Sequence, residues 1–100
     1  MIHMQKSEII AHLKSRFPEI QRKFNVKTIS IFGSASRNEL KPESDIDILI
    51  EFSHAIGIFD FIRLQKSLEA GLGRRVDLVS IDALKKQLRE KILKEAIRAA

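Results

Sequence analysis

The sequence predicts a small α/β (α+β) domain in which a mixed β-sheet of three or more strands is flanked by helices. Segments with helical spacing of apolar residues alternate with short β-branched runs, in the order helix, strand, short helix, strand, helix, strand, helix. Apolar residues make up 44% of the chain, with only four Gly and two Pro, which indicates a folded core rather than disorder. At 100 residues, the chain is expected to form a single domain over residues 1–100.

The first helix is expected over residues 7–24, where apolar side chains recur near helical spacing. Pro18 lies inside this segment and lacks a backbone N–H, so a break or a second short helix is expected there. Asn25 is expected to end the helix, because Asn tolerates the left-handed conformation that is common at helix ends.

Three strands are expected, because β-branched residues recur with alternation. In the second strand, alternate isoleucines share one face, whereas Asp45, Asp47 and Glu51 share the other. The expected strands cover residues 26–32, 45–52 and 75–80, separated by a helical turn or short helix at 34–40 and by loops at 41–44 and 53–57.

The last two helices lie on either side of the third strand in the sequence. An apolar stripe predicts a helix over residues 58–70, closed by a Gly-Leu-Gly sequence, with Phe59 off the stripe. Ser80 or Asp82 can cap the final helix, which is expected to run to about Arg98. The stripe comprises Ile58, Phe61, Ile62, Leu64 and Leu68.

The composition narrows the classes of function. The absence of Cys excludes disulfides, a thiol nucleophile and Cys-based zinc sites. The N-terminus has no apolar segment of signal-peptide length, and no apolar run approaches the roughly 20 residues of a membrane span, so a cytoplasmic location without membrane contact is expected. The net charge of +5 either attracts nucleic acid or phosphate-bearing ligands or simply reflects a soluble surface with scattered Lys. The basic residues are scattered, however, and Trp and Tyr are absent, so direct nucleic-acid binding is not expected.

Asp45 and Asp47 are the first candidate metal ligands. Two apart on a strand, their side chains point the same way, with Cβ atoms roughly 6.5 Å apart. Two such carboxylates repel, and one pKa rises unless a cation lies between them; Mg²⁺ prefers one or two carboxylates plus phosphate oxygens. Alternatively, Asp45 simply caps the preceding loop at an exposed strand start.

Gly33 and Ser34 follow the first strand and form a candidate phosphate-binding turn. A residue without Cβ lets backbone N–H groups approach an anion, and the Ser hydroxyl can donate a further hydrogen bond. Arg37 lies one helical turn later and can bind a phosphate with two parallel hydrogen bonds. The alternative is an ordinary strand-to-helix turn.

Asp77 lies between apolar residues of the third strand. If that strand neighbours the second, Asp77 can join Asp45 and Asp47 in a three-carboxylate cluster that holds two metal ions and deprotonates an attacking hydroxyl. The alternative is an edge-strand Asp that faces water.

The three His residues show no spacing typical of metal ligands and no partner for a nucleophile. His3 and His12 are expected to be exposed helix residues, and His54 a loop residue. Glu51 is expected to be solvated rather than a ligand.

With these motifs in place, the chain resembles the minimal nucleotidyltransferases, which belong to the superfamily that includes DNA polymerase beta and the aminoglycoside nucleotidyltransferases. The resemblance runs from about Val26 to the end of the chain and implies the nucleotidyltransferase fold. The family often has Gly where this chain has Asn38, which is tolerated if that residue is left-handed. The matching segments are 31–34, Arg37, 44–50, 75–79 and 92–96.

The resemblance also implies roles for individual residues. In the family, the Gly and Ser that correspond to Gly33 and Ser34 hold the triphosphate of the nucleotide. The residues that correspond to Asp45 and Asp47 hold magnesium, and the one that corresponds to Asp77 completes the metal site and assists the incoming hydroxyl. Two Mg²⁺ ions and ATP as substrate are therefore implied.

The small members of the family are similar to antitoxins that pair with a HEPN-type toxin protein, a helical ribonuclease. They transfer AMP from ATP to a tyrosine of that partner, so the resemblance implies a Mg²⁺-dependent protein adenylyltransferase in a hetero-oligomer. One alternative is a non-catalytic antitoxin that neutralises its partner by direct binding. Apolar residues of the final helix, together with Phe59, either contact such a partner or form a wide core face. Another alternative is a nucleotide polymerase or a modifier of small molecules, for which the chain lacks further domains.

Overall fold

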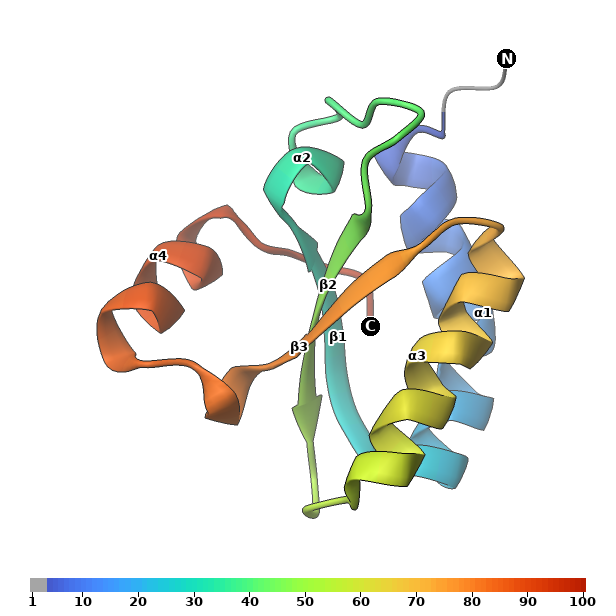
Figure 1. The fold of residues 1–100 in the computed structure, drawn as a ribbon, viewed down its shortest axis with the longest axis vertical. Helices are drawn as coiled ribbons and strands as arrows, with labels where there is room; N and C mark the ends of the chain where they lie inside the picture. Colours follow the sequence, from blue (N-terminus) through green and yellow to red (C-terminus); the bar gives the residue numbers. More distant parts are fainter. Residues whose placement is uncertain (1–3) are drawn as a thin grey trace.

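Residues 4–100 are described by the computed structural model of the protein, and they fold around one mixed β-sheet (Figure 1). The prediction made for His3 lies outside the described residues. The elements are α1 (Lys6–Phe24), β1 (Val26–Phe32), α2 (Gly33–Ser36), β2 (Ile46–Phe52), α3 (Ile58–Leu72), β3 (Val76–Ser80), the 3₁₀-helix η1 (Ile81–Ala83), α4 (Lys86–Glu95) and β4 (Ile97–Arg98).

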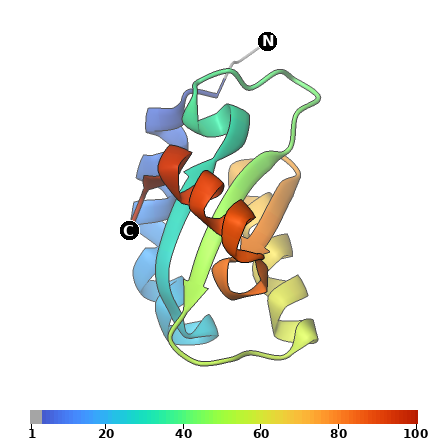
Figure 2. The same ribbon diagram turned by 90° about the vertical axis from the view of Figure 1, so that its left-hand side faces the viewer.

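The strand order in the sheet is β3-β2-β1-β4. Strand β1 pairs antiparallel with both β2 and β4, whereas β3 runs parallel to β2. Helices α1 and α3 lie together on one face of the sheet, and α4 crosses the other face (Figures 1 and 2). The predicted fold class, a small mixed sheet flanked by helices, is therefore confirmed.

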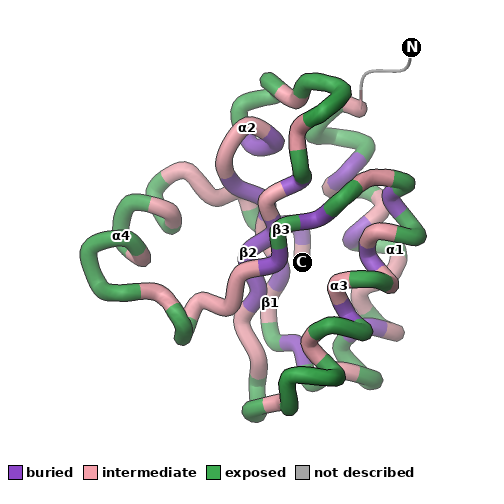
Figure 3. The backbone as a smooth tube through the Cα atoms, in the orientation of Figure 1, coloured by how far each residue is buried: buried purple, intermediate pink, exposed green. Residues whose placement is uncertain are grey.

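The core lies between the sheet and the pair α1 and α3, which agrees with the buried segments seen along the backbone (Figure 3). The face that Ile46, Ile48 and Ile50 were predicted to share is this core face, and all three have no exposed surface. Burial of each such side chain contributes about 1.5–3 kcal/mol. The opposite face of β2 carries Asp47 and Glu51, so the alternation predicted from the sequence separates the core from the candidate site.

Helix α1 is continuous, and the break expected at Pro18 is wrong. Pro18 is exposed, and its missing N–H removes one intrahelical hydrogen bond. A proline inside a helix lowers the stability of the helix by about 3 kcal/mol. Residues Leu13 and Ile20 are buried on either side of the proline, so packing of both halves against the core outweighs that cost. The helix ends as predicted at Asn25, whose φ of 57° is left-handed.

Helices α1 and α3 approach closely where Gly71 faces His12 and Arg16. His12 is half-buried, so the prediction of an exposed helix residue is wrong. Burial, with a smaller effect from the charge of Arg16, lowers the pKa of His12. Arg16 fixes the crossing by donating hydrogen bonds to the carbonyl and the hydroxyl of Ser67, at 2.8 and 2.7 Å.

The buried stripe of α3 differs from the predicted one. Leu64, Leu68 and Leu72 are buried, but Ile58 and Ile62 are 65% and 38% exposed. At about 100° per residue, Ile58 and Ile62 lie roughly 120–160° around the helix from Leu64, which takes them off the face that meets the sheet. Phe59 lies off this face as predicted and is 75% exposed.

The end of the chain also differs from the expectation of one long helix to Arg98. The 3₁₀-helix η1 follows β3, α4 ends at Glu95, and β4 pairs Ile97 with Ile31 of β1. Without this strand, the outer edge of β1 would carry unpaired backbone groups, and β4 satisfies them. Ser80 precedes η1 and makes no side-chain capping hydrogen bond.

Within residues 4–100, no helix is both long enough and apolar enough to cross a membrane.

Candidate active site

Asp47 and Asp77 lie side by side on the sheet face that α4 crosses. The parallel register of β2 and β3 pairs these two residues, and the antiparallel register of β1 and β2 places Phe32, the residue before Gly33, opposite Asp47. The condition stated for Asp77, that the third strand neighbours the second, is therefore met. The structure thus brings one carboxylate from each of two strands to the point where β1 turns into α2.

Burial and the neighbouring carboxylates disfavour the ionised form of Asp47. The pKa of its carboxyl rises from 3.8 to about 6. The largest cause is burial, followed by the charge of Asp77 and a hydrogen bond with it, and then by the charges of Asp45 and Glu95. A group of carboxylates that cannot all ionise freely is the arrangement that a cation relieves.

Asp45 lies just before β2 and is exposed. Its Oδ1 atom is 3.3 Å from Nε of Arg75 in an ion pair that is open to solvent. No group of three His, Asp or Glu side chains within residues 4–100 is arranged to hold a metal ion as it stands. The structure therefore brings Asp47 and Asp77 together while Asp45 pairs with Arg75, and the three-carboxylate metal site stays a prediction.

The turn at Gly33 brings the backbone against Asp47. Gly33 has a φ of +63°, in the left-handed region that favours glycine. A Cβ added here would lie 3.2 Å from Cγ of Asp47 and would overlap its Oδ2 atom. The buried Ser36 hydroxyl donates to the Gly33 carbonyl at 2.8 Å, and the Glu39 N–H donates to the Ser34 carbonyl at 2.8 Å. Only glycine fits at position 33, because any side chain there would collide with the Asp47 carboxylate.

Asn38 closes the segment after the turn. Its φ of 61° is left-handed, as expected for the position where the family often has Gly. The side chain of Asn38 accepts a hydrogen bond from the N–H of Lys6 at 2.9 Å and donates to the side chain of Gln5. The turn is thereby fastened to the start of α1.

Glu95 is one of two residues near the site to which the sequence analysis gave no role, although it lies in the segment 92–96 that resembles the family. Its Oε1 accepts a hydrogen bond from the Gly33 N–H at 2.5 Å, and its Oε2 accepts one from Nη1 of Arg37 at 3.2 Å. Glu95 lies 62 residues after Gly33, and no local pattern distinguishes it from a solvated Glu at the end of a helix. Arg37 also lies 3.4 Å from Glu39, so two carboxylates share its guanidinium.

Arg74 is a second residue that sequence reasoning missed. Its Nη2 donates to the carbonyls of Lys41 and Ser44, the latter at 2.6 Å. These carbonyls belong to the loop that leads into Asp45. Arg74 therefore connects the residues just before β3 to the loop just before β2, next to the candidate site.

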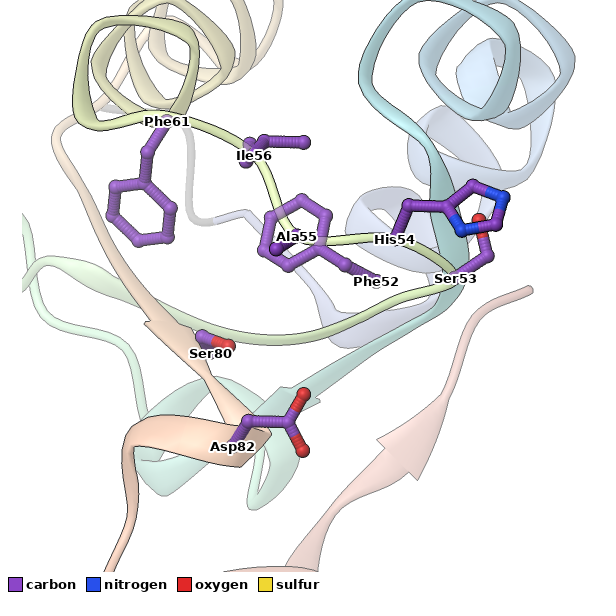
Figure 4. A pocket seen from close by; sticks show the side chains of 8 residues that line it. All are labelled: Phe52, Ser53, His54, Ala55, Ile56, Phe61, Ser80 and Asp82. Carbon is purple, nitrogen blue, oxygen red and sulfur yellow. The ribbon is translucent and has the colours of Figure 1, made fainter.

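A hollow of about 370 Å³ lies at the opposite ends of β2 and β3 (Figure 4). The rings of Phe52 and Phe61 form its apolar wall, with centroids 6.3 Å apart. His54 and Asp82 line it from the loop and from η1. His54 thus lies in an exposed loop, as predicted, and belongs to this hollow rather than to the group around Asp47.

The donor set at the paired carboxylates fits Mg²⁺. Asp47 and Asp77 supply hard oxygen ligands, and Mg²⁺ takes the rest of its shell from water and phosphate. The repulsion that raises the pKa of Asp47 is the penalty that a divalent cation removes. A glycine bend with an arginine lies directly beside these carboxylates, in a position suited to the phosphates of a nucleotide.

Paired carboxylates on a mixed sheet, beside a glycine bend and an arginine, are an arrangement suited to a class of enzyme that transfers a nucleotide to an acceptor. A family model described as the nucleotidyltransferase domain matches residues 8–99. The chain belongs to this family and is a nucleotidyltransferase.

Two relatives align over most of their length. Protein adenylyltransferase MntA of Thermococcus cleftensis is 38% identical over 97 residues, which cover 97% of this chain and 98% of the relative. A protein of Methanocaldococcus jannaschii, provisionally named a protein adenylyltransferase, is 42% identical over 88 residues, which cover 88% of this chain and 95% of that protein.

Solved structures agree on the fold. One, provisionally named a minimal nucleotidyltransferase, has a TM-score of 0.83 and 35% identity over 97% of this chain and 98% of its own. A toxin–antitoxin structure with AMP-PNP has a TM-score of 0.72 at 23% identity, over 97% of this chain and 73% of its own. A complex of a tri-AMPylated Shewanella oneidensis HEPN toxin with an MNT antitoxin has a TM-score of 0.66 at 19% identity, over 91% of this chain and 71% of its own. The last two are similar to this chain in fold alone.

Proposed function

We propose that the protein is a Mg²⁺-dependent protein adenylyltransferase. It transfers AMP from ATP to a hydroxyl, a tyrosine in our proposal, of a HEPN-type toxin partner, and thereby acts as an antitoxin. The observation that carries this proposal is the pairing of Asp47 with Asp77 beside the Gly33 turn. The two relatives named as protein adenylyltransferases support it, and so do the folds found in toxin–antitoxin complexes.

Each candidate site residue has a proposed role in this reaction. The backbone and hydroxyl at Gly33 and Ser34, together with the guanidinium of Arg37, would bind the triphosphate. Asp45, Asp47 and Asp77 would hold two Mg²⁺ ions, and Asp45 would leave Arg75 to do so. When bound, Mg²⁺ neutralises phosphate charge and favours ionisation of the acceptor.

In the proposed reaction, the exposed carboxylate of Asp77 accepts the proton of the acceptor hydroxyl. The hydroxyl oxygen forms a bond to the α-phosphorus of ATP, and the bond from that phosphorus to the bridging oxygen breaks. Pyrophosphate leaves with the bonding electrons. Asp47, which is less exposed than Asp77, is the better placed of the two to remain a ligand throughout.

Incubation with labelled ATP, Mg²⁺ and a HEPN-type protein from the same genome tests the proposal. We expect the partner to gain the mass of AMP, and Asp77→Asn to reduce transfer by at least about a hundredfold, the scale of a lost general base. Asp60→Asn, an exposed position on α3, is the matched control and should transfer normally. Full labelling by Asp77→Asn would refute the mechanism.

A non-catalytic antitoxin is the second candidate, and exposed apolar residues favour it. Phe59 on α3 is 75% exposed, and Leu88 and Leu93 on α4 are 49% and 46% exposed, so the protein has apolar surface for a partner. Neutralisation of the toxin by an Asp45→Asn, Asp47→Asn double variant would favour binding alone, whereas dependence on ATP would favour transfer.

A further inference from the structure

Glu95 binds the same groups that the proposed function assigns to the triphosphate. One oxygen of its carboxylate accepts from the Gly33 N–H, and the other accepts from the Arg37 guanidinium. A phosphate bound here would use its oxygens in the same way, as an anion between a backbone amide and an arginine. The two anions cannot occupy these donors at the same time.

The backbone of Glu95 is held between α4 and β4, whereas its side chain is partly open to solvent. Glu95 is the last residue of α4, and β4 follows two residues later with Ile97 paired to Ile31. Its side chain keeps 37% of its surface exposed, and that of Arg37 keeps 49%. A change of side-chain rotamer would therefore release both donors without unfolding α4 or the sheet edge.

The charges around Glu95 favour its departure when a nucleotide binds. Its carboxylate already lies near enough to Asp47 to repel it. A triphosphate brings more negative charge to the same donors and therefore repels Glu95. Its oxygens then accept the hydrogen bonds that Glu95 gives up.

Resting on the proposed function, we propose that Glu95 occupies the phosphate subsite in the nucleotide-free protein and sets the affinity for the nucleotide. The triphosphate displaces the carboxylate from Gly33 and Arg37, and Glu95 then turns to solvent. A ligand gains affinity only for what it binds beyond the contacts it replaces. Glu95 therefore lowers the affinity for any phosphate ligand and leaves the bond-forming step unchanged.

Calorimetric binding of ATP and of inorganic tripolyphosphate, each with Mg²⁺, tests this inference on the whole chain. We expect Glu95→Gln to bind both ligands about five- to tenfold more tightly than the wild type, because a charged competitor has been removed. Glu90→Gln removes the same charge from an exposed position of the same helix and should stay within about twofold of the wild type. Circular dichroism of each variant verifies the fold.

Two outcomes would overturn the inference. Unchanged affinity of Glu95→Gln would show that the carboxylate does not compete, and weaker binding would show that Glu95 instead holds the donors in place. In transfer assays, KM for ATP should fall in Glu95→Gln while kcat stays the same. If the wild type labels its partner but Glu95→Gln binds no more tightly, this inference alone fails; if Glu95→Gln binds more tightly but no variant transfers AMP, the proposed function alone fails.

Discussion

Asp47→Asn should stabilise the metal-free protein at neutral pH. The pKa of Asp47 rises from 3.8 to about 6 in the folded protein, chiefly through burial and the charge of Asp77. The folded state therefore binds a proton more tightly than the unfolded chain. The stability that this proton provides is complete below about pH 4, falls as the pH rises towards 6, and is lost above it.

The magnitude follows from the same values. At about 1.4 kcal/mol per pH unit, the interval from 3.8 to about 6 corresponds to about 3 kcal/mol. Asp47 is partly exposed, so screening by solvent reduces this to about 1–2 kcal/mol. Asparagine keeps the shape of the side chain and removes the charge. In a domain of this size, 1 kcal/mol corresponds to a shift in Tm of about 4–8 °C.

Thermal unfolding between pH 4 and pH 8, with a chelator present, measures the effect. The free energy of unfolding of the wild type should fall through the window from about pH 4 to pH 6 relative to Asp47→Asn, and the variant should have the higher Tm at pH 7.5. Asp82→Asn, at an exposed position in η1, should follow the wild type. Equal Tm values for wild type and Asp47→Asn at pH 7.5, with parallel pH profiles, would refute the raised pKa of Asp47.

The other predictions concern the turn, the loop and the cation. Gly33→Ala should lower the free energy of unfolding by about 1–2 kcal/mol and abolish nucleotide binding, because φ is +63° and the new Cβ would overlap Asp47. Gly57→Ala is the control, because a Cβ there meets nothing within 4 Å. Equal free energies of unfolding for the two variants in denaturant would show that Gly33→Ala introduces no strain. Mg²⁺ should raise the Tm of the wild type but not of Asp47→Asn, and an equal rise in both would argue against a cation at this carboxylate. Arg74→Ala should increase hydrogen exchange at Ser44 by at least about threefold, since the loop loses its hydrogen bonds to the guanidinium, and unchanged exchange would show that the loop is held otherwise.

Sequence patterns predicted the elements whose local preferences agree with their burial. In β2, three isoleucines alternate with Asp47, Leu49 and Glu51, so one pattern specified both the strand and the face that Asp47 occupies. Whether Asp77 lies beside Asp47 depends on the order of the strands, which the sequence does not give, so this contact could be predicted only on the condition that β3 neighbours β2.

Two features could not be predicted because they depend on distant parts of the chain. Helical spacing continues from Ile92 into Ala96, so the sequence gives no sign that the chain leaves the helix to pair with β1. The contact of Glu95 with Gly33 likewise joins residues 62 positions apart. The exposure of Ile62 was missed for another reason, since several apolar residues of α3 fit more than one helical face.

The long separation between Gly33 and Glu95 has a consequence for folding. Residues that are 62 positions apart meet only after a large loop has closed, and closing that loop costs conformational entropy. Contacts of this kind form late, so the Gly33 N–H and the Arg37 guanidinium should gain their carboxylate partner only when α4 packs against the rest of the fold.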